Sequence, residues 1–223
     1  MPADVPAELF LIGDSNVIAI AQAADDRGLP WWGGPLAAGR MLEEPFWCIE
    51  GRRFVYTAEG AGPIRARFED LLVFDGPVLT TLGFNSHRFT EDFARYARAQ
   101  DLPATPEALS RAAFADTVRD ARRVALEFYR MLGEHGREVW FTCSPQRTAL
   151  GLYPLLHAFE EVLIPEVAAT GARFIDTRDA VMDGASPRPE YANPHDAMHA
   201  SPALGALVLD RLAARRAGRT APV

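Results

Sequence analysis

Short apolar runs alternate along this chain with longer segments in which apolar residues recur every three or four positions. The runs typical of buried strands lie at residues 9–12, 78–82, 139–143 and 173–175. A further strand, or a hairpin, is expected between Phe46 and Tyr56. This alternation predicts an α/β fold in which helices cover both faces of a central parallel sheet of about five strands.

The strongest helical pattern runs from about residue 106 to residue 135 and stops at Gly136. Further helices are expected at residues 16–27, 151–169 and 202–216. Residues 84–106 have the least regular pattern, and we expect them to form a loop or small lid beside the carboxyl edge of the sheet. Because the chain shows no internal repeat, linker or change in composition, residues 1–223 are predicted to form a single domain.

Composition places the chain among soluble globular proteins, with 48% hydrophobic and 24% charged residues. The net charge of −7 leaves no basic stripe that would neutralise phosphates, so we expect neither a nucleic-acid partner nor an acidic membrane surface. The two cysteines, Cys48 and Cys143, are too few for a disulfide framework and are read as free thiols. Nothing in the sequence indicates the oligomeric state.

The first eight residues carry acids and prolines where a signal peptide would carry a basic region and then an apolar run. No stretch of the sequence reaches the roughly 18 consecutive apolar residues of a membrane-spanning helix. From these two observations we expect a cytoplasmic protein.

The segment Gly13-Asp14-Ser15-Asn16 follows the first apolar run and precedes the first helical pattern. At such a strand-to-helix turn, the Ser15 hydroxyl would project from the carboxyl edge of the sheet, with free backbone N–H groups behind it. A nucleophile needs this kind of position, but a serine also needs a neighbouring base to become reactive.

The far end of the chain offers that base in the segment from Asn193 to His199, where Asp196 lies three residues before His199. The pair Ser201-Pro202 is typical of a helix start, which predicts that His199 lies in the loop before it. In such a loop, Asp196 would orient the imidazole so that Nε2 is free to take a proton. His195 is the competing base, but it lacks a carboxylate at this spacing.

Four short segments in this order resemble the conserved blocks of the SGNH, or GDSL, hydrolase superfamily. Ser15 in Gly13-Asp14-Ser15 matches the nucleophile, although Asn16 stands where that family has leucine. Gly39 is the best match to the glycine of the second block, with Gly33 and Gly34 as alternatives. The third and fourth blocks are Gly83-Phe84-Asn85-Ser86, in which Ser86 replaces the usual aspartate, and Asp196-Ala197-Met198-His199.

The resemblance implies a three-layer, flavodoxin-like α/β/α fold and a serine esterase or O-deacetylase without cofactor or metal. Its catalytic residues would be Ser15, Asp196 and His199, and its substrate a small-molecule acyl ester. The oxyanion would be held by the N–H groups of Ser15 and Gly39 and by the side-chain amide of Asn85. Aromatic and imidazole side chains in the neighbouring loops are candidate substrate-binding residues, namely Trp31, Trp32, Phe84 and His87.

Two other functions fit the same residues. An acyltransferase would use the same serine and replace water by an acceptor alcohol, and a non-catalytic acyl- or sugar-binding module would account for Ser86 in the third block.

Three other classes fit less well. The glycines at positions 34 and 39 have the spacing of a phosphate-binding loop, but Arg40 stands where lysine is required. His195 and His199 are four apart, yet Pro194 argues against the helix that a zinc site of this spacing needs. Val17 stands where an α/β-hydrolase elbow requires glycine.

Overall fold

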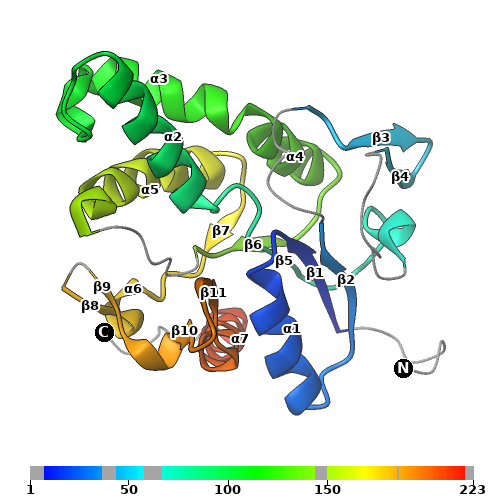
Figure 1. The fold of residues 1–223 in the computed structure, drawn as a ribbon. Coiled ribbons are helices and arrows are strands. Elements are labelled where there is room, and N and C mark those ends of the chain that lie inside the picture. Colours follow the sequence, from blue (N-terminus) through cyan, green and yellow to red (C-terminus); the bar gives the residue numbers. More distant parts are fainter. Residues whose placement is uncertain (1–7, 37–43, 58–66, 144–149, 185, 219–223) are drawn as a thin grey trace.

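The computed structural model describes residues 8–36, 44–57, 67–143, 150–184 and 186–218, and Figure 1 shows their arrangement. Five parallel strands form the central sheet in the order β2-β1-β5-β6-β7. Their bounds are β1(Leu9–Gly13), β2(Trp31–Pro35), β5(Val78–Thr80), β6(Val139–Phe141) and β7(Arg173–Phe174). In this flavodoxin-like order β2 is added on one side of β1, and β5 is added on the other side. Open α/β sheets form their binding crevice at such a point, here between β1 and β5.

Alternating side chains of β1 face the two sides of the sheet. Leu9 and Leu11 belong to the core beneath α1(Val17–Asp26) and α7(Pro202–Arg216). Phe10 and Ile12 belong to the opposite core, beneath α4(Arg123–Glu134) and α5(Tyr153–Ala168). The helices therefore form one layer on each face of the sheet (Figure 1), which confirms the predicted three-layer α/β/α architecture.

Two further helices extend the layer of α4 and α5. Helices α2(Ser86–Ala99) and α3(Arg111–Ala121), joined through the 3-10 helix η3(Pro106–Ala108), both pack against α5. Phe89 and Phe93 of α2 contact Phe114 of α3 at their base. Figure 1 shows the two helices above α5, on the outer side of the molecule.

The remaining elements are short. The hairpin β3(Trp47–Glu50) and β4(Arg53–Tyr56) confirms the hairpin expected between Phe46 and Tyr56. The 3-10 helices are η2(Phe68–Asp70), η4(Leu150–Leu152) and η5(Pro189–Tyr191), and α6(Arg178–Val181) is a single helical turn. Two small antiparallel pairs complete the fold, β8(Met182–Asp183) with β9(Ser186–Pro187) and β10(Ala192–Asn193) with β11(Asp196–Ala200).

The single helix predicted over residues 106–135 is wrong, because the structure divides it into η3, α3 and α4. The break between α3 and α4 falls at Arg122, whose backbone leaves the helical region with φ −121° and ψ 15°. Residues 84–106, expected to be irregular, contain α2 instead. Phe89, Phe93 and Ala97 recur every four residues on its buried face, a pattern that its many charged residues conceal.

Strand β2 is not among the strands predicted above, because the glycines and proline of Trp-Trp-Gly-Gly-Pro are typical of a loop. Glycine and proline weaken a central strand, but β2 lies at the edge of the sheet and, among the described residues, pairs with β1 alone. The local composition therefore hid a strand whose position makes glycine and proline tolerable.

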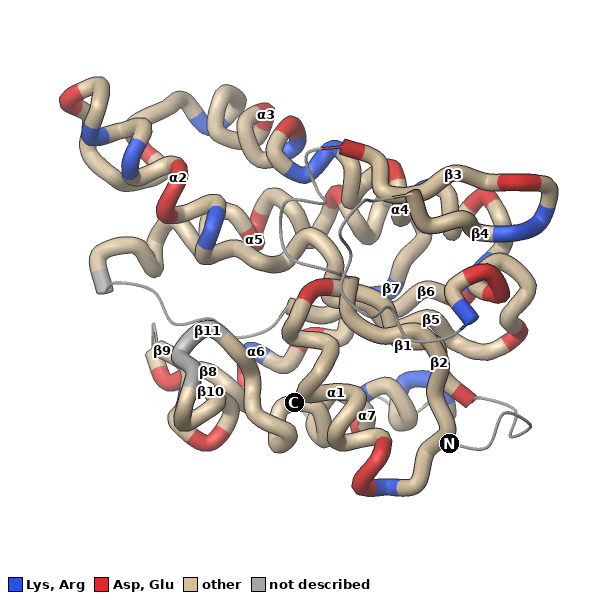
Figure 2. Tube along the Cα trace, turned by 45° about the vertical axis from the view of Figure 1, so that its right-hand side comes forward, with Lys and Arg blue, Asp and Glu red and all other residues tan. Residues whose placement is uncertain are grey.

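Acidic and basic residues are interspersed along α2 and α3 rather than gathered by sign (Figure 2). Over the part of the chain that the structure describes, no helix combines the length and apolarity needed to cross a membrane.

Candidate active site

Ser15 lies in the turn between β1 and α1, beside the end of β5. Gly13 is required for this close approach, because a Cβ atom there would lie 2.3 Å from Thr81 Oγ1. Leu36 N donates to the Gly13 carbonyl over 2.7 Å, which brings the end of β2 to the same turn. The serine therefore lies at the carboxyl edge of the sheet, where the sequence predicted it.

The side chain of Asp14 stabilises this turn through hydrogen bonds. Its Oδ1 accepts hydrogen bonds from the backbone N–H of Asn16, over 2.9 Å, and from the Thr81 hydroxyl, over 3.0 Å. Burial raises the pKa of the Asp14 carboxyl, and these hydrogen bonds oppose the rise only in part. The sequence indicates no separate role for Asp14, whereas in the structure its hydrogen bonds join the serine turn to the end of β5.

The structure brings His199 to Ser15, with 2.6 Å between His199 Nε2 and Ser15 Oγ. The neighbouring residues form a second link, since Ala200 N donates to Asn16 Oδ1 over 3.3 Å. Asn16 is buried, and its departure from the leucine of the resembling family thus has a structural use in this chain. The imidazole is positioned to accept the serine proton.

His199 was expected in a loop, but it belongs to strand β11, which pairs with β10. A strand of five residues in a two-stranded ribbon is too short to give a clear alternation of apolar and polar positions. The backbone of Asp196 opens the same strand, whereas its side chain lies outside the described residues, so its predicted orienting role stays a prediction. The His195 side chain is exposed, and its backbone N–H donates to Asn193 Oδ1 over 2.9 Å.

Asn85 follows β5 and precedes the first residue of α2. Gly83, at φ +89°, lets the chain turn sharply into this position. The Asn85 side chain is 6% exposed and makes no capping hydrogen bond to α2. Within the described ranges, its buried Oδ1 has no hydrogen-bond donor, so the amide is not committed to holding the helix.

A buried arginine holds the turn that carries Asn85. Arg122 Nε donates to the Gly83 carbonyl over 2.8 Å, and Nη2 donates to the Asn85 carbonyl over 3.3 Å. The guanidinium also lies over the Phe159 ring, 5.0 Å from its centroid. Burial lowers the pKa of Arg122 to about 10, so it remains charged at neutral pH. The sequence does not indicate this role of Arg122, because the residue occupies an ordinary polar position within the predicted helix of residues 106–135.

The glycine proposed for the oxyanion site, Gly39, lies outside the described residues. Its alternatives, Gly33 and Gly34, lie within β2, paired with Leu11 and Ile12 of β1. The role of Gly39 in the oxyanion site therefore stays a prediction.

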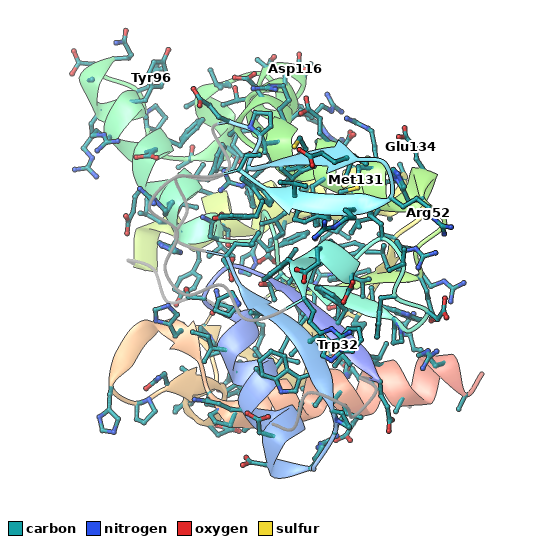
Figure 3. All side chains as sticks on the ribbon, turned by 90° about the vertical axis from the view of Figure 1, so that its right-hand side faces the viewer. Trp32, Arg52, Tyr96, Asp116, Met131 and Glu134 are labelled. Atoms are coloured by element: carbon teal, nitrogen blue, oxygen red, sulfur yellow. The ribbon has the colours of Figure 1, made fainter. Side chains whose placement is uncertain are left out.

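Three of the predicted substrate-binding residues are aromatic and lie in or against the two hydrophobic cores. Trp31 pairs with Leu9 at the amino end of β1, and its Nε1 donates to Asp25 over 2.8 Å. The Arg67 guanidinium lies over the Trp32 ring, which also contacts the tilted ring of Phe74, and Figure 3 shows Trp32 far from Tyr96 of α2. Phe84 is buried against Phe141. All three side chains contribute to packing, and their part in substrate binding stays a prediction.

His87 is the fourth predicted substrate-binding residue, and it lies in the first turn of α2, half-buried. Its predicted role in substrate binding stays a prediction.

A second group of ionisable residues lies after β6 and β7. Cys143 and Glu160 are buried, and the partly exposed Asp176 is paired with Arg178 over 2.6 Å. Burial raises the pKa of Glu160 to about 7, although the Arg178 charge acts against this rise. Burial also raises the pKa of the Cys143 thiol, so it is not a ready thiolate nucleophile.

Glu160→Gln is expected to stabilise the protein at alkaline pH and to have little effect at acidic pH. A raised carboxyl pKa means that the folded state disfavours the ionised form, so stability is lost as pH rises from about 4.5 to about 7. The rise from 4.5 to about 7 corresponds to about 3 kcal/mol in the free energy of unfolding. Urea unfolding at both pH extremes measures the effect.

Glu161→Gln is the matched control, because Glu161 is exposed on the same helix. Its stability is expected to follow that of the wild type at both pH values. A Glu160→Gln protein less stable than wild type at alkaline pH would show instead that the ionised carboxylate is stabilised by Arg178.

In the described part of the chain, no three side chains of the histidine, cysteine, aspartate or glutamate type are grouped to hold a metal ion. No protein-family model and no curated protein matches the chain.

Proposed function

We propose that this protein is a serine esterase of the SGNH type that hydrolyses small-molecule acyl esters through an acyl-enzyme on Ser15. The observation that carries the proposal is the 2.6 Å separation of Ser15 Oγ and His199 Nε2. Two residues from opposite ends of the chain meet at hydrogen-bond distance at the sheet edge where α/β folds place their sites.

In the first step, Ser15 Oγ attacks the ester carbonyl while His199 Nε2 takes the hydroxyl proton. The tetrahedral intermediate then collapses, the bond to the alkoxy oxygen breaks, and His199 returns the proton to the departing alcohol. In the second step, water attacks the acyl-enzyme with His199 again as base, and the carboxylic acid leaves Ser15 free.

Asn85 is the side-chain donor that we propose for the oxyanion of both intermediates. Its turn follows β5, which pairs with β1, and the Thr81 to Asp14 hydrogen bond joins the two strand ends. A buried amide that does not cap its helix, held through its backbone by Arg122, is suited to stabilise charge that develops during reaction. The Ser15 N–H and a glycine N–H, for which Gly39 is the candidate, would complete the oxyanion site.

A serine-reactive fluorophosphonate is expected to add once to the wild-type protein and not to Ser15→Ala, as measured by intact mass. The reagent requires an activated hydroxyl, which the contact with His199 supplies. Ser110→Ala is the matched control, since Ser110 caps α3 through its Oγ and should have no part in the reaction. Labelling that persists in Ser15→Ala, or no labelling of the folded wild type, would contradict the proposal.

A further inference from the structure

A groove of about 540 Å³ opens between α2 and α3, and its inner end is formed by Asn85 and Arg122. Its outer end reaches Tyr96, which is 55% exposed and projects at the tip of α2 (Figure 3). The helical rise from Asn85 to Tyr96 makes the groove about 16 Å long. This volume falls within the range of small-molecule sites.

Small side chains on α3 leave space between the two helices. Ala113, Thr117 and Ala121 recur every four residues on the α3 wall, and Phe89 and Phe93 form much of the α2 wall. Because both helices are supported by α5, the space between them needs no side chain to fill it. The result is a groove with an apolar interior, whose charged lining outside its inner end comes from Arg88 and Asp92.

The position of His199 decides which part of an ester would enter this groove. The leaving alkoxy oxygen must face His199, which returns the proton to it. His199 precedes Ala200, which is buried in the core of α1 and α7, whereas Phe89 belongs to the core of α4 and α5. The alcohol part of the substrate would therefore lie toward the layer of α1 and α7, and the acyl part toward the layer of α4 and α5.

We propose that the groove between α2 and α3 binds the hydrocarbon chain of the acyl group, so that the substrates are esters of medium-chain fatty acids. The inference rests on the proposed function, because it takes Asn85 as the group that faces the oxyanion. An acyl chain leaving the carbonyl carbon beside Asn85 enters the groove at its inner end and runs toward Tyr96. Burial of its methylenes then stabilises the bound substrate.

The first experiment compares p-nitrophenyl acetate, butyrate and octanoate as substrates of the wild-type protein. Each methylene buried in an apolar site is worth about 0.8 kcal/mol, which is up to about fourfold in kcat/KM. We expect octanoate to exceed acetate in kcat/KM by at least about tenfold. Equal kcat/KM values for the three esters, or a preference for acetate, with Ser15 still labelled by the fluorophosphonate, would contradict acyl-chain binding in the groove. The same result would leave the proposed esterase activity unaffected.

The second experiment fills the groove with Ala113→Trp. Ala113 is exposed on the α3 wall, so the larger side chain has room without disturbing the core. We expect kcat/KM for octanoate to fall about tenfold or more, with acetate nearly unchanged. Ala112→Trp is the matched control, since Ala112 is exposed on the same helix and does not line the groove. Equal effects of the two variants would overturn the proposal.

Direct binding separates the groove from the chemistry. Dodecanoate is titrated by calorimetry into Ser15→Ala, with and without Ala113→Trp. Binding that Ala113→Trp abolishes supports the groove even if no ester is hydrolysed, and absence of binding together with a flat ester series refutes it. Loss of the proposed function alone would appear as a failure to label Ser15.

Discussion

Changing His199 to alanine is expected to lower kcat for ester hydrolysis by about 10⁴-fold or more, and Ser15→Ala to have a similar effect. In the proposed mechanism the two groups act as one unit, because the serine is a weak nucleophile until the imidazole 2.6 Å away removes its proton. The double variant should therefore be no slower than either single variant. Steady-state kinetics with a p-nitrophenyl ester measure all three.

His195→Ala is the control for this experiment. His195 is exposed and was the competing base in the sequence, so its loss is expected to leave kcat within about twofold of wild type. If His195→Ala were inactive and His199→Ala active, the observed pairing of Ser15 with His199 would have no catalytic meaning.

Asn85→Ala is expected to lower kcat by about 10²- to 10³-fold, with little change in KM. Removal of one oxyanion donor typically costs this much, because the donor acts on charge that exists only in the transition state. The effect on stability should be small, since Asn85 makes no side-chain cap to α2. Kinetics and thermal unfolding of the same preparation separate the two contributions.

Asn85→Asp sharpens this test, because it keeps the shape of the side chain and replaces the donor by an acceptor. At neutral pH a carboxylate would repel the oxyanion, so this variant should be at least as slow as Asn85→Ala. An Asn85→Asp protein with nearly wild-type kcat would remove Asn85 from the oxyanion site.

The layers of the fold could be predicted from the sequence because they depend on long patterns. Residues 9–12 form an uninterrupted apolar run, as a strand covered on both faces requires. Residues 202–216 begin with a proline that follows Ser201 and repeat apolar positions at helical spacing, and α7 has these bounds. Patterns of this kind survive in any tertiary environment that supplies a core.

The elements that were missed depend on distant partners. Strand β2 exists because β1 offers it an edge, and the division of α3 from α4 lies at Arg122, whose guanidinium reaches carbonyls nearly forty residues earlier in the chain. Neither signal is local. The periodicity on either side of Arg122 is helical, so a single helix was the natural prediction.

Only those residues of the candidate site that belong to short sequence motifs could be predicted. Ser15 and His199 could be chosen from a strand-to-helix turn and a histidine before a helix start. The buried hydrogen bonds that hold them, from Thr81 to Asp14 and from Ala200 to Asn16, join residues with no sequence pattern in common. Such links become visible only when the sheet edge has been assembled.

The Ser15 and His199 contact spans 184 positions of the chain. The serine turn emerges early in synthesis, but its partner follows only after every strand of the central sheet has been made. Helix α7 contacts both β11, which carries His199, and α1, which follows the serine turn. On the proposed function, Ser15 would therefore gain its reactivity only after α7 had docked on α1, so that labelling of Ser15 during refolding would report the assembly of these two chain segments.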